Sequence, residues 1–83
     1  MKSDRIIPDK NTIRFLTVPE AAQRMTVGED IINRCLDVDL IGYIYIKRRR
    51  VIPNFEFNRF ANSLIGKDLY RVLEEAEAHA MEF

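Results

Sequence analysis

The spacing of apolar residues changes twice along this chain, and those changes limit the folds it can adopt. Between residues 17 and 37 apolar residues recur every three or four positions, which predicts helices. Between residues 43 and 52 they alternate with other residues, which predicts β-strands. The helical spacing returns after Pro53 and continues to Met81. We therefore expect an α+β, mostly helical fold with one β-hairpin between helices.

Two short helices are expected before the hairpin. Thr17 and Glu20 have the spacing of a capping box, and Pro19 suits a first turn, so a helix should begin after Thr17. A second helix is expected after Gly28, with Cys35 on its buried side. Two short helices joined by a tight turn form a candidate helix-turn-helix.

Basic side chains concentrate at the expected tip of the hairpin. The whole chain of 83 residues has 13 basic and 13 acidic residues, and this zero net charge excludes a polycation that binds by bulk charge alone. Four of the basic residues are nevertheless consecutive: Lys47, Arg48, Arg49 and Arg50. Neither glycine nor asparagine stands at this tip, so the type of turn stays open.

The expected order of elements is that of a small winged helix-turn-helix with a two-stranded β-hairpin wing and an added C-terminal helix. We divide the chain into an N-terminal arm (1–14), the winged domain (15–64) and a C-terminal amphipathic helix (65–83). In the winged domain, Phe57 and Phe60 should be buried on the helix that follows the hairpin.

The composition leaves little material for catalysis. The chain has one cysteine, one histidine and no glycine-rich phosphate loop. We therefore expect no enzymatic activity, no metal site and no cofactor. No apolar run is long enough to span a membrane. The N-terminal residues lack the apolar region of a signal peptide, so we expect a cytoplasmic location.

The sequence resembles the excisionase and MerR-like DNA-binding domains. The residues that carry the likeness are the opening Leu-Thr-Val-Pro-Glu-Ala-Ala at 16–22, the turn residue Val27, the pair Ile52-Pro53 after the hairpin, and Glu56, Phe57 and Phe60 of the closing helix. The likeness extends from Phe15 to Phe60, and residues 27–30 are also similar to the recognition-helix start of conjugative-transposon excisionases.

Several positions depart from the family pattern. Asp39 and Lys47 stand where the family has glycine, and Val51 stands where it has arginine. Glu29 and Asp30 are acidic at the start of the expected recognition helix, where they would repel DNA phosphates. One carboxylate could nevertheless accept a hydrogen bond from the amino group of a cytosine.

The resemblance implies a DNA-binding accessory protein of a mobile element. Such an excisionase binds and bends double-stranded DNA near attachment sites, associates with further copies on the DNA, and assists a tyrosine-type integrase. Two alternatives stay open. One is a small MerR-like or phage transcription regulator, and the other is a protein-interaction module that does not bind DNA.

Seven residues are candidates for DNA contact. On the second helix, Asn33 suits adenine, and Arg34 suits guanine or a phosphate. The hairpin arginines suit phosphates or a narrow minor groove. The full set is Arg24, Asn33, Arg34, Lys47, Arg48, Arg49 and Arg50. Tyr43 and Tyr45 are expected to cover the sheet rather than to stack on bases.

Overall fold

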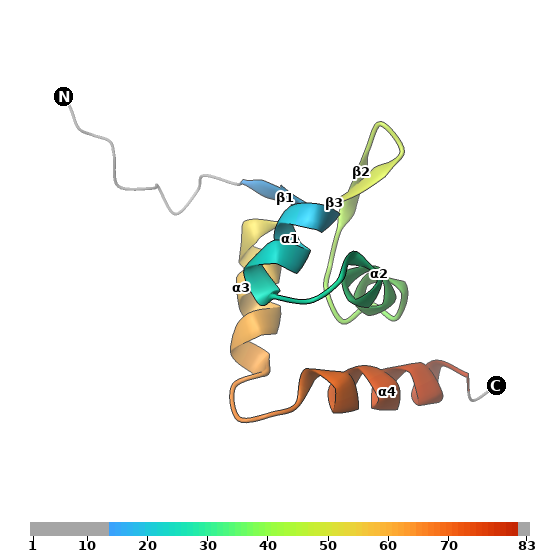
Figure 1. Cartoon of the computed structure of the whole chain (residues 1–83). Helices are drawn as coiled ribbons and strands as arrows, with labels where there is room; N and C mark the ends of the chain where they lie inside the picture. The colour runs from blue at the N-terminus through green and yellow to red at the C-terminus, as the bar shows by residue number, and fades with distance from the viewer. Residues whose placement is uncertain (1–13, 82–83) are drawn as a thin grey trace.

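The computed structural model describes residues 14–81, which form four helices and a three-stranded antiparallel sheet (Figure 1). In chain order the elements are β1 (Phe15–Thr17), α1 (Val18–Met25), α2 (Glu29–Asp37), β2 (Ile44–Ile46), β3 (Arg49–Pro53), α3 (Asn54–Ser63) and α4 (Leu69–Ala80). The expected α+β, mostly helical class is confirmed. The arm predicted for residues 1–14 lies, apart from Arg14, outside the described residues.

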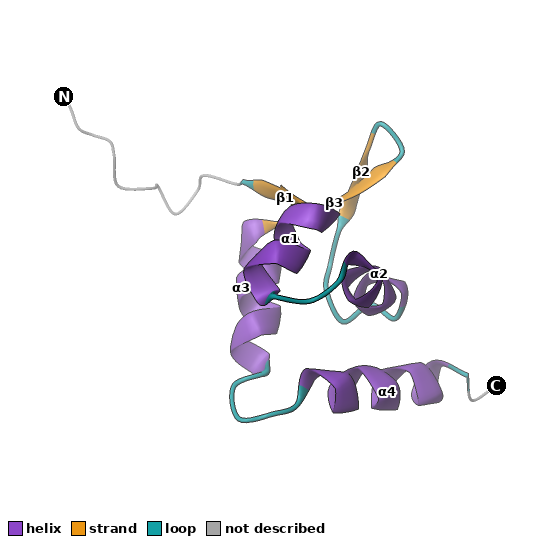
Figure 2. Ribbon diagram, in the orientation of Figure 1, coloured by secondary structure: helices purple, strands orange, loops and turns teal. Residues whose placement is uncertain are grey.

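The sheet has one strand more than the two-stranded hairpin that the sequence predicts. Its strand order is β1-β3-β2 (Figure 2). Strand β1 pairs with β3 in a register that places Leu16 opposite Ile52. The amide of Asn54 also donates to the carbonyl of Arg14 at 2.7 Å, which fixes β1 against the first residue of α3. Residues 15–17 therefore serve first as an edge strand and then, at Thr17, as the start of α1.

The first two helices begin where the sequence predicts. The hydroxyl of Thr17 accepts from the Glu20 amide at 3.3 Å, and the Glu20 carboxylate accepts from the Thr17 amide at 2.8 Å, so the capping box is formed. The Glu20 carboxylate also accepts from the Thr17 hydroxyl, and the hydrogen bonds from the Thr17 amide and hydroxyl hold the pKa of Glu20 below its usual value. Gly28 is the residue before α2, and Cys35 is fully buried on that helix.

One hydrophobic core joins the sheet to α1, α2 and α3. Its fully buried large side chains come from α2, the loop after it, β3, α3 and α4: Ile32, Leu36, Ile41, Ile52, Phe60 and Leu73. Phe57 is also buried on α3, as predicted. Burying one such side chain stabilises the fold by roughly 1.5–3 kcal/mol. Helix α4 contributes one of them, Leu73.

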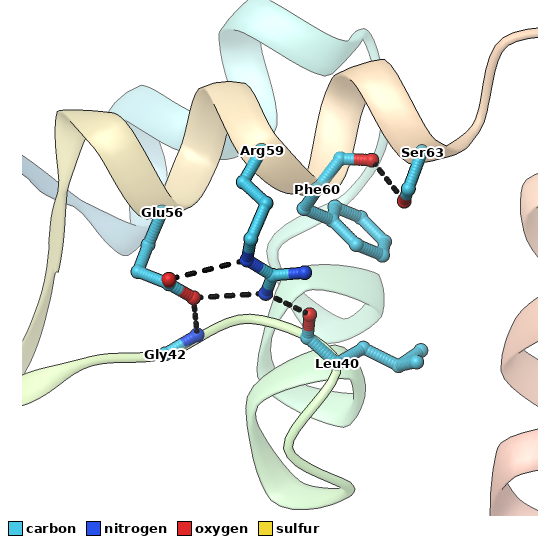
Figure 3. Close-up of polar contacts among 6 residues, drawn as sticks. All are labelled: Leu40, Gly42, Glu56, Arg59, Phe60 and Ser63. Carbon is cyan, nitrogen blue, oxygen red and sulfur yellow. Dashed lines mark hydrogen bonds and ion pairs between the residues drawn. The ribbon is translucent and has the colours of Figure 1, made fainter.

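Polar contacts from α3 fix the loop between α2 and β2 (Figure 3). The Glu56 carboxylate accepts from the Gly42 amide at 2.8 Å and from Arg59 at 2.8 Å. Arg59 also donates to the Leu40 carbonyl at 3.0 Å. The hydrogen bonds from Arg59 and Gly42 lower the pKa of Glu56. Ile41, which lies between these contacts in the chain, is fully buried. The burial of Ile41 and the polar contacts together fix the loop and so determine where β2 starts.

Candidate nucleic-acid interface

The basic run lies on a tight turn and on the first part of β3. Ile46 pairs with Arg49, so only Lys47 and Arg48 connect the two strands. Their φ angles are 50° and 69°, and two successive positive values are the signature of a type I′ turn, whose twist suits a hairpin. The turn type that the sequence left open is thereby defined. Lys47, Arg48 and Arg49 are all exposed.

Beside this turn lies a hollow of about 470 Å³, which we call the hairpin hollow. Residues from the start of α1, from α2 and from both hairpin strands line it: Thr17, Val18, Pro19, Asn33, Tyr45, Arg48, Arg49, Arg50 and Val51. Three of these are arginines, and no acidic side chain of residues 14–81 is among them. The arrangement is a concave surface of positive charge with apolar walls, which suits an anionic ligand.

Three of the seven predicted residues are basic side chains of the hairpin that remain available to a ligand. The side chains of Lys47, Arg48 and Arg49 form no hydrogen bond or ion pair with another residue of the described range. Arg24 is exposed too, but it lies in the last turn of α1 and does not line the hairpin hollow. The structure therefore brings the hairpin arginines together with Asn33, whereas Lys47 and Arg24 lie outside the lining of the hollow.

The Arg50 side chain is engaged in contacts within the protein. Its guanidinium donates to Asp37 at 2.7 Å and to the Asn33 side-chain oxygen at 2.9 Å. The same group lies 5.2 Å from the centre of the Tyr43 ring. The hydrogen bond to Asp37, the largest of several causes, raises the pKa of Arg50. Arg50 thus joins the hairpin to α2, and its charge is already paired.

Arg34 is likewise engaged within the protein. Its Nε and Nη2 atoms donate to the two carboxylate oxygens of Glu77 at 2.8 and 2.7 Å. Glu77 is on α4, 43 residues away in sequence, and no local pattern pointed to it. Two parallel hydrogen bonds of this kind form the strongest common geometry of an arginine–carboxylate pair.

Tyr45 was expected to cover the sheet, but its side chain is 66% exposed and lines the hairpin hollow. Its ring meets Tyr43 edge to face, with 5.6 Å between the ring centres. The period-two pattern identified the strand correctly, yet it could not show which side of the hairpin is left uncovered. Thr17, Val18 and Pro19 were also missed, because their place beside the hairpin depends on the pairing of β1 with β3.

Acidic side chains lie around the hollow rather than in it. Glu29 and Asp30 are exposed in the first turn of α2, and Asp37 is at its last turn beside Arg50. The exposed surface of α2 is therefore mixed in charge, whereas the hairpin side is basic. This asymmetry makes the hairpin, rather than α2, the main source of attraction for an anion.

Comparison of the chain with protein-family models, with curated proteins and with solved structures gives no significant match. Within residues 14–81 no group of three or more histidine, cysteine, aspartate or glutamate side chains is arranged to hold a metal ion. None of the four helices described here has the length and apolar character needed to cross a membrane.

Proposed function

We propose that this protein binds double-stranded DNA through the hairpin hollow. The observation that carries the proposal is the meeting of Arg48 and Arg49 with Asn33 on one concave surface whose described lining holds no acidic side chain. Phosphate contacts position a protein on DNA, and contacts to base edges specify the sequence. Both kinds of group are present on this surface.

The arrangement of α1, α2 and the β2–β3 hairpin supports a winged helix-turn-helix, with the hairpin as the wing. Asp39 and Lys47 replace glycine in the resembling family, and they have φ angles of 62° and 50°. These are left-handed conformations that glycine adopts most readily. The departures in sequence are therefore compatible with the backbone path that the resemblance implies.

We assign the contacts as follows. Arg48, Arg49 and Lys47 neutralise phosphates along one backbone strand. Asn33 faces the base edges, and because its side-chain oxygen already accepts from Arg50, its amide hydrogens are the donors it offers. Arg50 positions Asn33 and the hairpin relative to each other. Arg24 contacts the flanking backbone, if the DNA extends past the hollow.

Within DNA-binding proteins, the sequence resemblance supports an accessory role in excision of a mobile element rather than transcription control. An excisionase bends its site, so a duplex labelled at both ends should show increased energy transfer when the protein binds. A pre-formed dimer in the absence of DNA, measured by light scattering, would instead favour the regulator. If the protein does not bind DNA, does not alter the energy transfer and forms no dimer, the protein-interaction module is favoured.

The direct test is binding to a random duplex of about two helical turns, measured by fluorescence anisotropy over a salt series of roughly 50–200 mM. The log–log slope of affinity against salt should fall in magnitude by about 1.8 in the Arg48→Ala/Arg49→Ala variant, because each phosphate contact contributes about 0.9. Affinity for all duplex sequences should fall together.

A matched control removes two positive charges elsewhere. Lys67 lies just before α4, and Arg71 lies in its first turn at 3.7 Å from Glu75; both are exposed and neither lines the hairpin hollow. The Lys67→Ala/Arg71→Ala variant should therefore keep most of the wild-type slope. If the two double variants lose affinity equally, attraction is non-local and the assigned surface is wrong.

A further inference from the structure

The ion pair between Arg34 and Glu77 occupies a side chain of the helix next to the proposed DNA surface. Both carboxylate oxygens of Glu77 accept from Arg34, at 2.7 and 2.8 Å, and the two side chains are 31% and 41% exposed. These hydrogen bonds use the Nε–Nη2 edge of the guanidinium, one of the edges that binds phosphate or guanine in a bidentate manner. In this state Arg34 presents a neutralised pair to its surroundings.

Helix α4, which carries Glu77, is attached to the body by few apolar contacts. Leu73 is its one fully buried side chain, while Leu69, Val72 and Ala76 are only partly buried. The segment that joins it to α3 contains Gly66 at a φ of +82° with no heavy atom near the position of a Cβ. Figure 1 shows α4 running past α2 at the end of the molecule away from the hairpin.

Helix α4 also brings negative charge close to Arg34. Glu74 and Glu75 are exposed on the same helix, and Glu77 is held ionised because the hydrogen bonds from Arg34 lower its pKa. A carboxylate beside a guanidinium both satisfies its donors and repels an approaching phosphate. The Nε–Nη2 edge of Arg34 cannot hold Glu77 and a phosphate at the same time.

We propose that α4 is an autoinhibitory element in which Glu77 takes the place of a DNA phosphate on Arg34. This inference rests on the proposed function and specifies how that surface is regulated. Full-strength binding requires Arg34 to exchange Glu77 for DNA, so the free protein binds more weakly than its set of cations allows. A ligand of α4 that withdraws Glu77 would raise affinity for DNA, because it would favour the released state.

The test is Glu77→Gln, which keeps the shape of the side chain and removes its charge. Affinity for the random duplex should rise on the order of 3–10-fold, and the log–log salt slope should increase by about 0.9 as Arg34 gains one phosphate contact. The control is Glu74→Gln on the same helix, which removes an equal charge that has no hydrogen bond to Arg34. In Arg34→Gln/Glu77→Gln the additional slope should disappear.

Each other outcome has a defined meaning. Equal effects of Glu77→Gln and Glu74→Gln would reduce the result to general charge and overturn the inference. Weaker binding by Glu77→Gln would show that Glu77 positions Arg34 for contact, which also overturns it. Failure of wild type and Glu77→Gln alike to bind duplex would instead overturn the proposed function.

A second measurement uses the wild-type protein and does not depend on how the variants fold. Amide hydrogen exchange over residues 69–80 should become faster when duplex is added, because release of Glu77 loosens α4. Unchanged or slower exchange in a protein that is saturated with DNA would contradict the release of this helix.

Discussion

Lys47 and Arg48 hold the hairpin turn in left-handed backbone conformations, at φ angles of 50° and 69°. A side chain in this region costs roughly 1–2 kcal/mol, and glycine avoids most of that cost. The chain retains cations where glycine would be more stable. This choice is understandable if the charge at the tip is used for binding, since stability is commonly given up at functional positions.

Arg48→Gly should therefore change stability and binding in opposite directions. The free energy of unfolding should rise by about 0.5–1 kcal/mol, because glycine relieves the strained turn at some entropic cost in the unfolded chain. DNA affinity should fall, because one phosphate contact is lost. Thermal unfolding and anisotropy measure the two effects.

Arg49→Gly is the matched control, since Arg49 lies in β3 and is not among the residues at positive φ. The same change of residue should there lower stability as well as affinity, because glycine weakens a strand. Stabilisation by both variants would contradict the assignment of strain to the turn.

Gly42 is a second position at which the size of the side chain matters. A Cβ added at this position would lie 2.7 Å from the Glu56 carboxylate oxygen that accepts from its own amide. Gly42→Ala should push Glu56 aside and lower the free energy of unfolding by about 1.5–3 kcal/mol, the value of a hydrogen bond to a charged group. Urea unfolding measures the change, and an effect as small as that of an exposed surface substitution would show that Glu56 does not hold the loop.

At the scale of elements, Arg50 is the group that joins the hairpin to α2. It contacts Asp37, Asn33 and Tyr43, and its side chain is only 20% exposed. The aliphatic part of an arginine also covers apolar surface, so the neutral, unbranched side chain of methionine keeps the packing while it removes the polar contacts.

Arg50→Met should make amide hydrogen exchange faster over β2 and β3 and leave exchange in α3 nearly unchanged. It should also reduce discrimination between DNA sequences, because Asn33 loses its support. Arg49→Met, at the neighbouring exposed position, should lower affinity with little change in exchange. If Arg50→Met leaves hairpin exchange as in the wild type, Arg50 does not fix the hairpin.

The elements that the sequence predicted are those specified by nearby residues. Residues within one or two helical turns of each other determine the capping box of α1, the apolar spacing in α2 and the boundary at Pro53. Strand β1 was missed because three residues are too short for a periodic signal, and its formation depends on β3.

The site was predicted in part for the same reason. A run of basic residues at a turn is visible in sequence, so the exposed place of Arg48 and Arg49 on the hairpin could be predicted. The partners of Arg34 and Arg50 were not, because ion pairs over 43 and 13 residues depend on how α4 and the hairpin pack against α2. The seven candidates therefore fall into three groups: the exposed cations Arg24, Lys47, Arg48 and Arg49, the hydrogen-bonded pair Asn33 and Arg50, and Arg34, which is paired with Glu77 of α4.

At the scale of the whole molecule, three carboxylates connect elements or cap them: Glu20, Glu56 and Glu77. Hydrogen bonds hold the pKa of each below the ordinary value of 4.5. Because the folded protein binds these protons less readily than the unfolded chain, their contribution is fully present above that value. It is lost as the pH falls through the lowered values of the folded state.

Stability measured by urea unfolding should therefore decline between about pH 5 and pH 3. Glu56→Gln should lower stability at neutral pH and make the decline less steep, because one of the three linked carboxylates is gone. Glu74→Gln, which removes a carboxylate with no hydrogen bond to another residue of the described part, should leave the steepness as it is. Equal steepness in the wild type and Glu56→Gln would show that this linkage is absent.

Amide chemical shifts during titration with a short duplex will show whether DNA lies against the hairpin hollow. The largest changes should occur at residues 45–51, at Thr17 and Val18, and at the side-chain amide of Asn33. Changes that are confined to α3, or the absence of any change at the hairpin while DNA binds, would contradict this position of the DNA.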